Sequence, residues 1–325
     1  MTGIIIRRLM QSLVVLFVMS LLVFAGVFAI GNPVEILIAG DADQAERARA
    51  IVALGLDRPL WEQYVLFLLN VFRGDLGNSF VFNVSALGLL VERLPATLEL
   101  AVSALVFAIV VGIPLGMYAG YRPDSPCSRI IMAGSILGFS LPTFWVGLML
   151  IMVFAVEFGW LPSTGRGQTA TVLGITSSLF TRDGLAHIVL PAFNLALLKM
   201  SLVIRLTRAG MRENLPMDYV KFARAKGLRM RRVVLVHVLK NIMIPIVTVV
   251  GLEFGNLIAF SVVTESVFSW PGIGKLIVDS INRLDRPVIV AYMMITVGMF
   301  VLLNLLVDLL YLVLDPRVRL AGQER

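Results

Sequence analysis

The sequence predicts an all-α integral membrane protein with six transmembrane helices and a small outer region between the first two. The chain of 325 residues is 58% hydrophobic and 15% charged, which is too little polar surface to cover a water-soluble protein of this length. It also contains six apolar stretches of the roughly 20 residues that cross about 30 Å of hydrocarbon as a helix. These stretches are Leu9 to Ile30, Thr97 to Gly120, Ile131 to Val156, His187 to Leu206, Ile242 to Val263 and Val288 to Leu314.

The first apolar stretch follows Arg7 and Arg8, as the core of a signal peptide would. Its apolar run is longer than the roughly 7–15 residues of such a core, so we expect a membrane anchor. In the outer region that follows, Asp43 to Leu56 and Trp61 to Phe72 have the composition of short helices. The second is apolar and, at about 12 residues, too short to span a bilayer. We therefore expect it to lie on the membrane surface or against a neighbouring subunit.

The positions of the cations predict the orientation, because Lys and Arg concentrate on the cytoplasmic side of membrane proteins. With the N-terminus inside, the inner segments are short and densely basic, whereas the cations of the outer segments are spread over longer loops that also carry most of the acids. Both termini are therefore predicted to be cytoplasmic. The net charge of +7 is explained by this topology and does not require a nucleic-acid partner.

The glycines and prolines of the spans predict how they pack and bend. Glycines recur at fourfold spacing, which lets helix backbones approach closely. Prolines free a backbone carbonyl and kink a helix, so they make hinges possible. The glycines are Gly112, Gly116, Gly120, Gly134, Gly138, Gly251 and Gly255, and the prolines are Pro114, Pro142 and Pro191.

No catalytic, metal or cofactor site is expected on this chain. His187 and His237 lie near opposite membrane faces, and a single cysteine, Cys127, offers neither a disulfide nor a thiolate metal site. The segment Pro271 to Leu276 resembles a phosphate-binding loop, but Ser269 replaces the leading glycine and the Ser or Thr after the lysine is missing. Uphill transport by this chain would therefore need a partner or an ion gradient.

Ionisable residues inside spans are costly and mark candidate sites. For Glu99 and Asp308, near the ends of their spans, we favour solvation or pairing between helices. Lys199 either extends to the cytoplasmic interface or lines a solute path, where it would bind an anionic group. Glu253 lies midway along its span, and we favour a pore-facing position. These two residues support an alternative function: an ion-coupled secondary transporter that uses Glu253 and Lys199. A third class, a membrane-bound enzyme, has no supporting motif.

The main cytoplasmic loop contains a predicted helical elbow. Asp218, after Pro216, is suited to cap a helix start, and Gly227 to end the helix with a left-handed residue. A second helix is expected from about Met230, ending before Pro245. The predicted elbow would sit either on anionic lipid or in a protein groove; its break favours the groove, because a helix on lipid needs none. The face predicted to be available for docking comprises Tyr219, Phe222, Ala223 and Lys226, with Lys221 and Arg224 pointing elsewhere.

The segment from Asp218 to Leu228, followed by His237, Asn241 and Pro245, resembles the cytoplasmic signature of permease subunits in binding-protein-dependent ABC importers of the dipeptide/oligopeptide class. Further matches cover nearly the whole chain, and their order and spacing are specific. They are Gly55-Leu56-Asp57-Arg58-Pro59, Arg73-Gly74-Asp75-Leu76-Gly77, Leu94-Pro95-Ala96-Thr97-Leu98-Glu99-Leu100, Leu141-Pro142-Thr143-Phe144-Trp145, Trp160-Leu161-Pro162, Phe268-Ser269-Trp270-Pro271-Gly272-Ile273-Gly274 and Asp315-Pro316-Arg317.

The resemblance implies a type I ABC importer permease fold in a bacterial inner membrane. It also implies these partners: a second homologous permease, two cytoplasmic ATPase subunits that hold ATP and Mg²⁺, and an outer solute-binding protein. The chain would divide into an N-terminal cytoplasmic tail and first helix (1–30), a periplasmic region (31–96), a permease core (97–316) with the coupling loop at about 207–241, and a cytoplasmic tail (317–325). The cargo would be a peptide or a related small solute.

The residues that the resemblance assigns to ATPase coupling are Asp218, Tyr219, Phe222, Ala223, Arg224, Ala225, Lys226 and Gly227. Lys199 and Glu253 are candidates for the translocation path because of their depth in the spans, not because of the resemblance. The sequence departs from the family at five places. Lys221-Phe222-Ala223 replaces a glutamate-alanine-alanine core, so docking would depend on shape and apolar contact. Ser128 and Leu284 stand where Asp and Arg are frequent, and Lys199 and Glu253 replace uncharged residues, which suggests a cargo preference.

Overall fold

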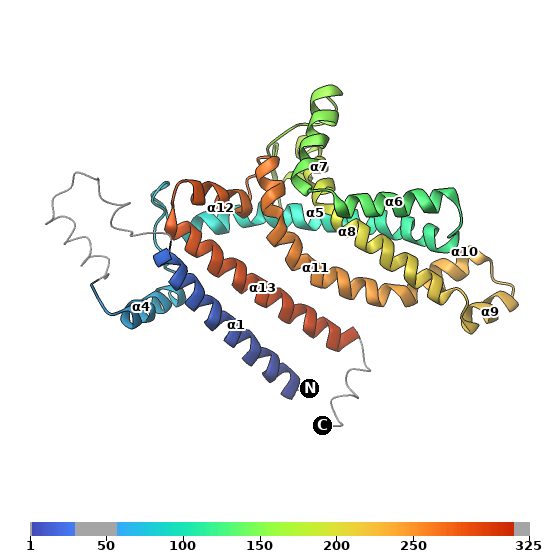
Figure 1. Ribbon diagram of the computed structural model, residues 1–325, viewed down its shortest axis with the longest axis horizontal. Coiled ribbons are helices and arrows are strands. Elements are labelled where there is room, and N and C mark those ends of the chain that lie inside the picture. Colours follow the sequence, from blue (N-terminus) through green and yellow to red (C-terminus); the bar gives the residue numbers. More distant parts are fainter. Residues whose placement is uncertain (1, 30–56, 315–325) are drawn as a thin grey trace. The chain divides into compact units, whose positions relative to one another are not determined.

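The computed structural model describes residues 2–29 and 57–314, and the side chains of residues 8–26 and 57–306 (Figure 1). It separates into two compact units, Met1–Leu94 with Leu276–Leu306 and Pro95–Lys275 with Val307–Arg325. The helix predicted over Asp43 to Leu56 lies outside the described residues.

Five of the six predicted spans are continuous helices, each long and apolar enough to cross a membrane. They are α1 (Thr2–Ala29), α5 (Ala86–Tyr121), α8 (Arg182–Asn214), the run from α10 (Met230–Arg232) through η3 (Val233–Val238) to α11 (Leu239–Val267), and α13 (Arg286–Leu314). Their number and order in the described chain confirm the predicted all-α membrane fold.

The third predicted span is not one helix. It consists of α6 (Pro126–Ser140) and the run of α7 (Thr143–Leu150) and η1 (Ile151–Glu157), which bend by 110° relative to each other. Leu141, between them, is extended with ψ 138°, as expected of a residue before proline. Pro142 then begins the new helix. The prolines Pro114 and Pro191 remain inside the continuous helices α5 and α8.

In the second unit α8 is the central helix, and it packs against α6, α7 and α11. Gly112, Gly116 and Gly120 of α5 also contact it: a Cβ atom at Gly116 would lie 2.6 Å from Thr207 Cβ and 2.7 Å from the Ile204 carbonyl oxygen. This confirms the predicted close helix packing for these three glycines.

The α5–α8 contact predicts the effect of a larger residue there. Gly116→Leu is expected to lower the thermal unfolding temperature in detergent, because overpacking a close helix contact costs about 1–3 kcal/mol. Gly134→Leu is the matched control, since a Cβ there meets no atom within 4 Å. Equal unfolding temperatures for the two variants would contradict the packing.

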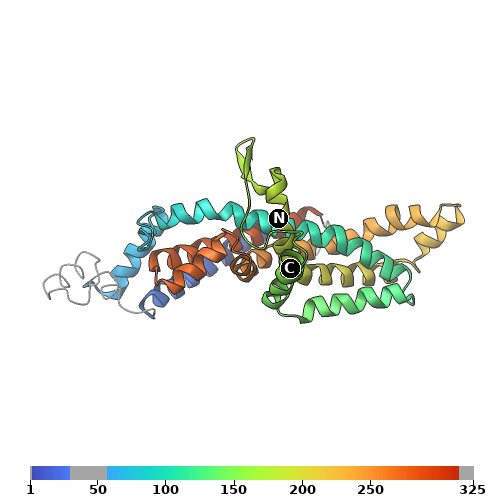
Figure 2. The same cartoon turned by 90° about the horizontal axis from the view of Figure 1, so that it is seen from above.

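Two features of the described chain were not predicted. A hairpin of β1 (Ala170–Val172) and β2 (Ile175–Ser177) stands out between η1 and α8 (Figure 2), followed by η2 (Ser178–Phe180). A further helix, α12 (Ile273–Asn282), begins in the segment that resembles a phosphate loop.

In the first unit α4 (Leu60–Phe72) confirms the short helix predicted over Trp61 to Phe72. Its Tyr64 hydroxyl lies 2.8 Å from the Ser20 hydroxyl of α1, and the Tyr64 ring contacts Phe17 and Phe24 edge-on. Because α4 packs against the chain's own first span, only its opposite face, which includes the exposed Phe72, is left for lipid or another subunit.

Candidate functional site: a basic elbow and an ion pair between spans

The predicted elbow is present and is formed by α9 (Asp218–Ala225) and the turn after it. Gly227 has φ +79°, so the prediction of a left-handed residue that ends this helix is confirmed. The predicted capping role of Asp218 is wrong. Met217 occupies the cap position without a side-chain bond, and Asp218, the first helical residue, pairs instead with Lys221 at 2.8 Å. Its charge still lies at the positive end of the helix.

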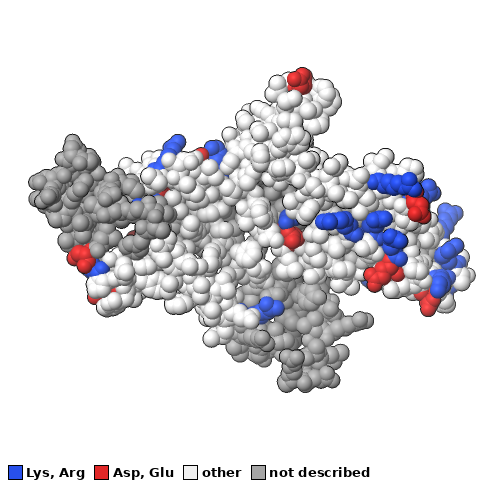
Figure 3. Space-filling view, in the orientation of Figure 1, with Lys and Arg blue, Asp and Glu red and all other residues white. Residues whose placement is uncertain are grey.

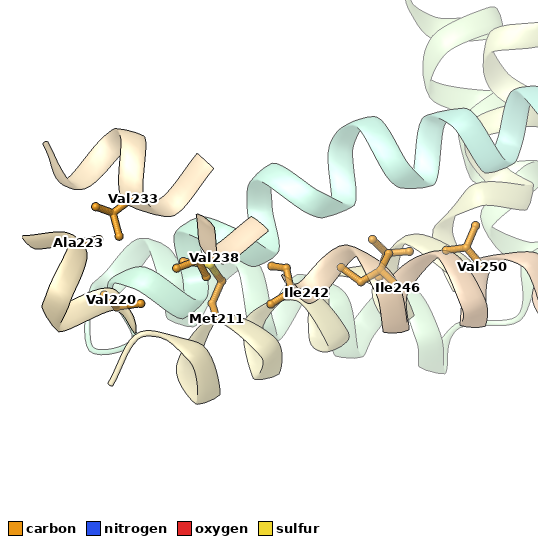
Figure 4. Packing of buried hydrophobic residues seen from close by; sticks show 9 residues of the cluster. Met211, Val220, Ala223, Val233, Val238, Ile242, Ile246 and Val250 are labelled. Carbon is orange, nitrogen blue, oxygen red and sulfur yellow. The ribbon is translucent and has the colours of Figure 1, made fainter. Parts of the chain in front are cut away.

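One face of α9 is buried within its own chain. Val220 and Ala223 pack in an apolar cluster with Met211 of α8 and Val233 and Val238 of η3 (Figure 4). The same cluster continues along α11 through Ile242, Ile246 and Val250. It therefore joins the elbow to the adjoining ends of α8 and α11 through continuous side-chain packing.

This packing corrects the predicted docking face. Ala223 is 7% exposed, and Tyr219 is half-buried with its hydroxyl donating to Asn214 Oδ1 at 2.9 Å. Tyr219 and Ala223 therefore do not point outward. This side of α9 faces inward because Val233 and Val238 need an apolar surface to pack against. Of the predicted face, Phe222 and Lys226 are exposed.

The outward face of α9 is basic with one aromatic residue. Phe222 is 62% exposed, and the Lys226 ammonium lies 4.5 Å from its ring centroid. Arg224 and Ala225 are exposed beside it, and so is Gly227. Lys and Arg gather over the end of this unit that carries α9 and α10 (Figure 3). The exposed aromatic ring, surrounded by cations, is the kind of surface that enters a groove on a partner.

The helix after the elbow differs from its prediction. It does not end before Pro245 but runs from Met230 to Val267 with this proline inside. Its η3 part has π-helical hydrogen bonding. A helix is retained here because hydrocarbon offers no water to an interrupted backbone.

Lys199 of α8 and Glu253 of α11 form an ion pair, and Asn256 Nδ2 donates to the same Glu253 oxygen, Oε2, at 3.3 Å. Lys199 is buried at 7% exposure, and its ammonium group contacts Glu253 and does not extend to the cytoplasmic interface; whether it lines a solute path stays a prediction. The two candidate path residues are brought together, and each neutralises the other.

Glu99 is neither solvated nor paired with another span, contrary to the prediction; its partners lie in the segment between η1 and α8. Its carboxylate pairs with Arg166 and accepts hydrogen bonds from the Ser178 hydroxyl and, at 3.0 Å, from the Ser178 backbone N–H. The side chain of Asp308 lies outside the described residues.

Sequence reasoning missed Glu265, which is fully buried near the end of α11. It accepts hydrogen bonds from Thr97 Oγ1 at 2.7 Å, from Ser261 Oγ at 3.0 Å and from the Lys275 backbone N–H at 3.0 Å. Thr97 in turn accepts from the Ile273 backbone N–H at 2.9 Å. Two glycines close to this carboxylate, Gly272 and Gly274, are the local sequence feature that could have indicated it.

A chain of apolar spans, one of them broken, with a basic elbow at one end of α8 and α11, has the organisation of a transport permease. Comparison with known proteins assigns it to a family. The chain belongs to the binding-protein-dependent transport system inner membrane components, whose model matches residues 112–320, and the N-terminal model of such components matches residues 1–101.

Curated relatives match along nearly their whole length. The dipeptide transport system permease protein DppB of Escherichia coli is 39% identical, with 97% of this chain and 98% of the relative covered. The oligopeptide permease protein AppB of Bacillus subtilis is 38% identical (98% and 99% covered), and the glutathione permease protein GsiC of Escherichia coli is 37% identical (98% and 99% covered).

Among solved structures, a chain of the MetNI methionine ABC transporter in an inward-facing conformation is similar, with a TM-score of 0.51 and 18% identity. The match covers 70% of this chain and 96% of that one, and it shows the shared fold. Together with the family membership, it confirms the predicted type I importer permease fold. The chain is an integral inner-membrane permease subunit of an ABC importer.

Proposed function

We propose that this chain forms half of the path by which short peptides, or a related small solute, enter the cell, and that separate ATPase subunits drive it through α9. The dipeptide, oligopeptide and glutathione systems of the relatives all carry peptides or peptide derivatives. The observation that carries the coupling role is the shape of α9: one face is packed into the ends of α8 and α11, and the other presents Phe222 outward.

The packing gives this role a physical route. A partner that moves Phe222 also moves Val220 and Ala223, because they belong to the same eight-residue helix. Through Met211 and Ile242 the displacement reaches α8 and α11, which are joined again by the Lys199–Glu253 pair. Closely packed side chains transmit such shifts because interiors have low compressibility. The coupling residues Asp218, Phe222, Arg224, Ala225 and Lys226 would touch the ATPase, while Tyr219, Ala223 and Gly227 would hold their position.

The proposed assembly contains a second homologous permease, two cytoplasmic ATPase subunits and an outer solute-binding protein. ATP and Mg²⁺ would bind the ATPases, and this chain would hold no cofactor and carry out no chemical step. Both termini would lie in the cytoplasm, on the side of α9. The cations around α9 support this orientation, because Lys and Arg concentrate on the cytoplasmic side of membrane proteins.

Reconstitution in proteoliposomes tests the proposal. The complete complex, with its binding protein, is expected to take up labelled peptide only when ATP is present on the side of α9. The chain alone, given proton or sodium gradients, is expected to show no uptake. Flux driven by a gradient through the chain alone would support the ion-coupled alternative and contradict this function.

The exposed Phe222 predicts how α9 holds its partner. Phe222→Ala is expected to weaken ATPase attachment by about 1–3 kcal/mol, a typical cost of removing an aromatic residue from an interface centre. Leu235→Ala is the control, since Leu235 is 58% exposed but lies on η3. Co-purification of the ATPase at rising salt measures the loss; equal retention by both variants would refute the docking face.

A further inference from the structure

The Lys199–Glu253 pair leaves one carboxylate oxygen open. Glu253 Oε2 accepts from both Lys199 and Asn256, whereas Oε1 has no hydrogen-bond partner among the described residues. The Glu253 side chain is 25% exposed, against 9% for that of Lys199. The pair is therefore asymmetric: the cation is enclosed by the protein, and the anion is presented at the surface.

The open oxygen belongs to a residue deep in the membrane helix. Glu253 lies 14 residues before Val267, the last residue of α11, which is roughly 21 Å from that end at 1.5 Å per residue, and further still from Met230, where the span begins. A partly exposed carboxylate at this depth is not stable against lipid, because charge in hydrocarbon is strongly disfavoured, and it marks a solute path or a polar contact. Asn256, one turn further along, keeps the same face polar.

The chemistry of the pair matches a zwitterion. A short peptide carries an ammonium group at one end and a carboxylate at the other, with no net charge from its ends. The open Glu253 oxygen can accept a hydrogen bond from an ammonium group. The positive charge of Lys199 offsets part of the carboxylate's attraction for that group, which allows the solute to leave. Lys199 itself, being enclosed, does not offer its charge to a carboxylate.

We propose that Glu253 Oε1, with Asn256 beside it, is a transient binding site for the terminal ammonium group of a peptide in transit. The inference rests on the proposed function, since it takes its substrate class from there. It reverses the expectation that Lys199 binds an anionic group: Lys199 positions the Glu253 carboxylate, and Glu253 touches the solute.

The test uses the complete complex in proteoliposomes with labelled dialanine as the probe. Glu253→Gln is expected to lower dialanine uptake about tenfold, which corresponds to about 1.4 kcal/mol. The double variant Lys199→Met with Glu253→Gln removes both charges, so no charge is left unpaired. It is expected to stay equally low, because the carboxylate is not restored. Assembly with the ATPase subunits, measured by co-purification, is expected to be unchanged in both variants.

Other results overturn the inference. If the double variant restored uptake, the Lys199–Glu253 pair would only stabilise the fold. Loss of assembly of the complex in the double variant would lead to the same conclusion. Unchanged uptake by Glu253→Gln would remove Glu253 from the path. Glu213→Gln, an exposed carboxylate at the end of α8, controls for charge loss elsewhere. If the unmodified complex with its binding protein takes up no dialanine, the proposed function of peptide uptake is contradicted. The inference about Glu253 then fails because it depends on that function.

Discussion

Gly227→Pro is expected to lower ATP-driven uptake about 100-fold or more, because a proline that its site cannot accommodate costs about 3 kcal/mol or more. Gly227 has φ +79°, whereas proline is fixed near −65°. The substitution also removes the Gly227 N–H, which donates to the Arg224 carbonyl oxygen at 2.9 Å and closes the turn. The angle between α9 and the helix that begins at Met230 would change, and the packing of Val220 on Val233 with it.

Gly227→Asn is the matched control, because asparagine tolerates the left-handed conformation better than other side chains. A Cβ at this position would meet no atom within 4 Å, so space is not limiting. Three measurements on each variant separate the causes: peptide uptake, capture of cargo by the binding protein, and ATP hydrolysis. Capture is expected to be unchanged throughout. Normal uptake by Gly227→Pro would contradict the coupling role.

Glu265→Ala is expected to destabilise the permease by about 3–5 kcal/mol, the upper end of single-substitution effects. Thr97 Oγ1 and the Lys275 backbone N–H would lose their carboxylate acceptor, and each buried donor left without a partner costs about 1–3 kcal/mol, whereas Ser261 Oγ keeps the Ile258 carbonyl oxygen at 2.8 Å. The loop that contains Trp270 would keep one attachment to the start of the second span, the bond from Trp270 Nε1 to the Ala96 carbonyl oxygen at 2.9 Å.

Thermal unfolding in detergent measures this loss. Glu157→Ala is the control: Glu157 is exposed, and its removal is expected to change the free energy of unfolding by less than about 0.5 kcal/mol. If Glu265→Ala unfolds at the same temperature as Glu157→Ala, the buried carboxylate does not hold this part of the fold together.

The sequence was sufficient to predict the membrane spans and the position of the elbow, because both depend on local chemistry. Hydrophobic length decides a span, and Gly227 ends α9 through its own conformational freedom. The break of the third span was harder to predict. Pro114, Pro142 and Pro191 are alike in the sequence, yet only Pro142 begins a new helix after a bend.

The contacts between distant residues could not be predicted from periodicity. Thr97 and Glu265 are 168 residues apart, and no local pattern pairs them. The inward face of α9 was likewise predicted wrongly, because an eight-residue amphipathic helix does not show which apolar side meets Val233 and Val238. The Lys199–Glu253 pair was found in part: both residues were singled out by their depth, but their contact with each other was not expected.

Photo-crosslinking from α9 in the intact complex tests the central claim most directly. A photoreactive phenylalanine analogue is incorporated at position 222, and in a second preparation at position 173, where Leu173 is 98% exposed on the β1–β2 hairpin. Illumination is expected to join position 222 to an ATPase subunit and to leave position 173 unattached to it. Crosslinks from position 222 to lipid alone, with the ATPase present and active, would contradict the account.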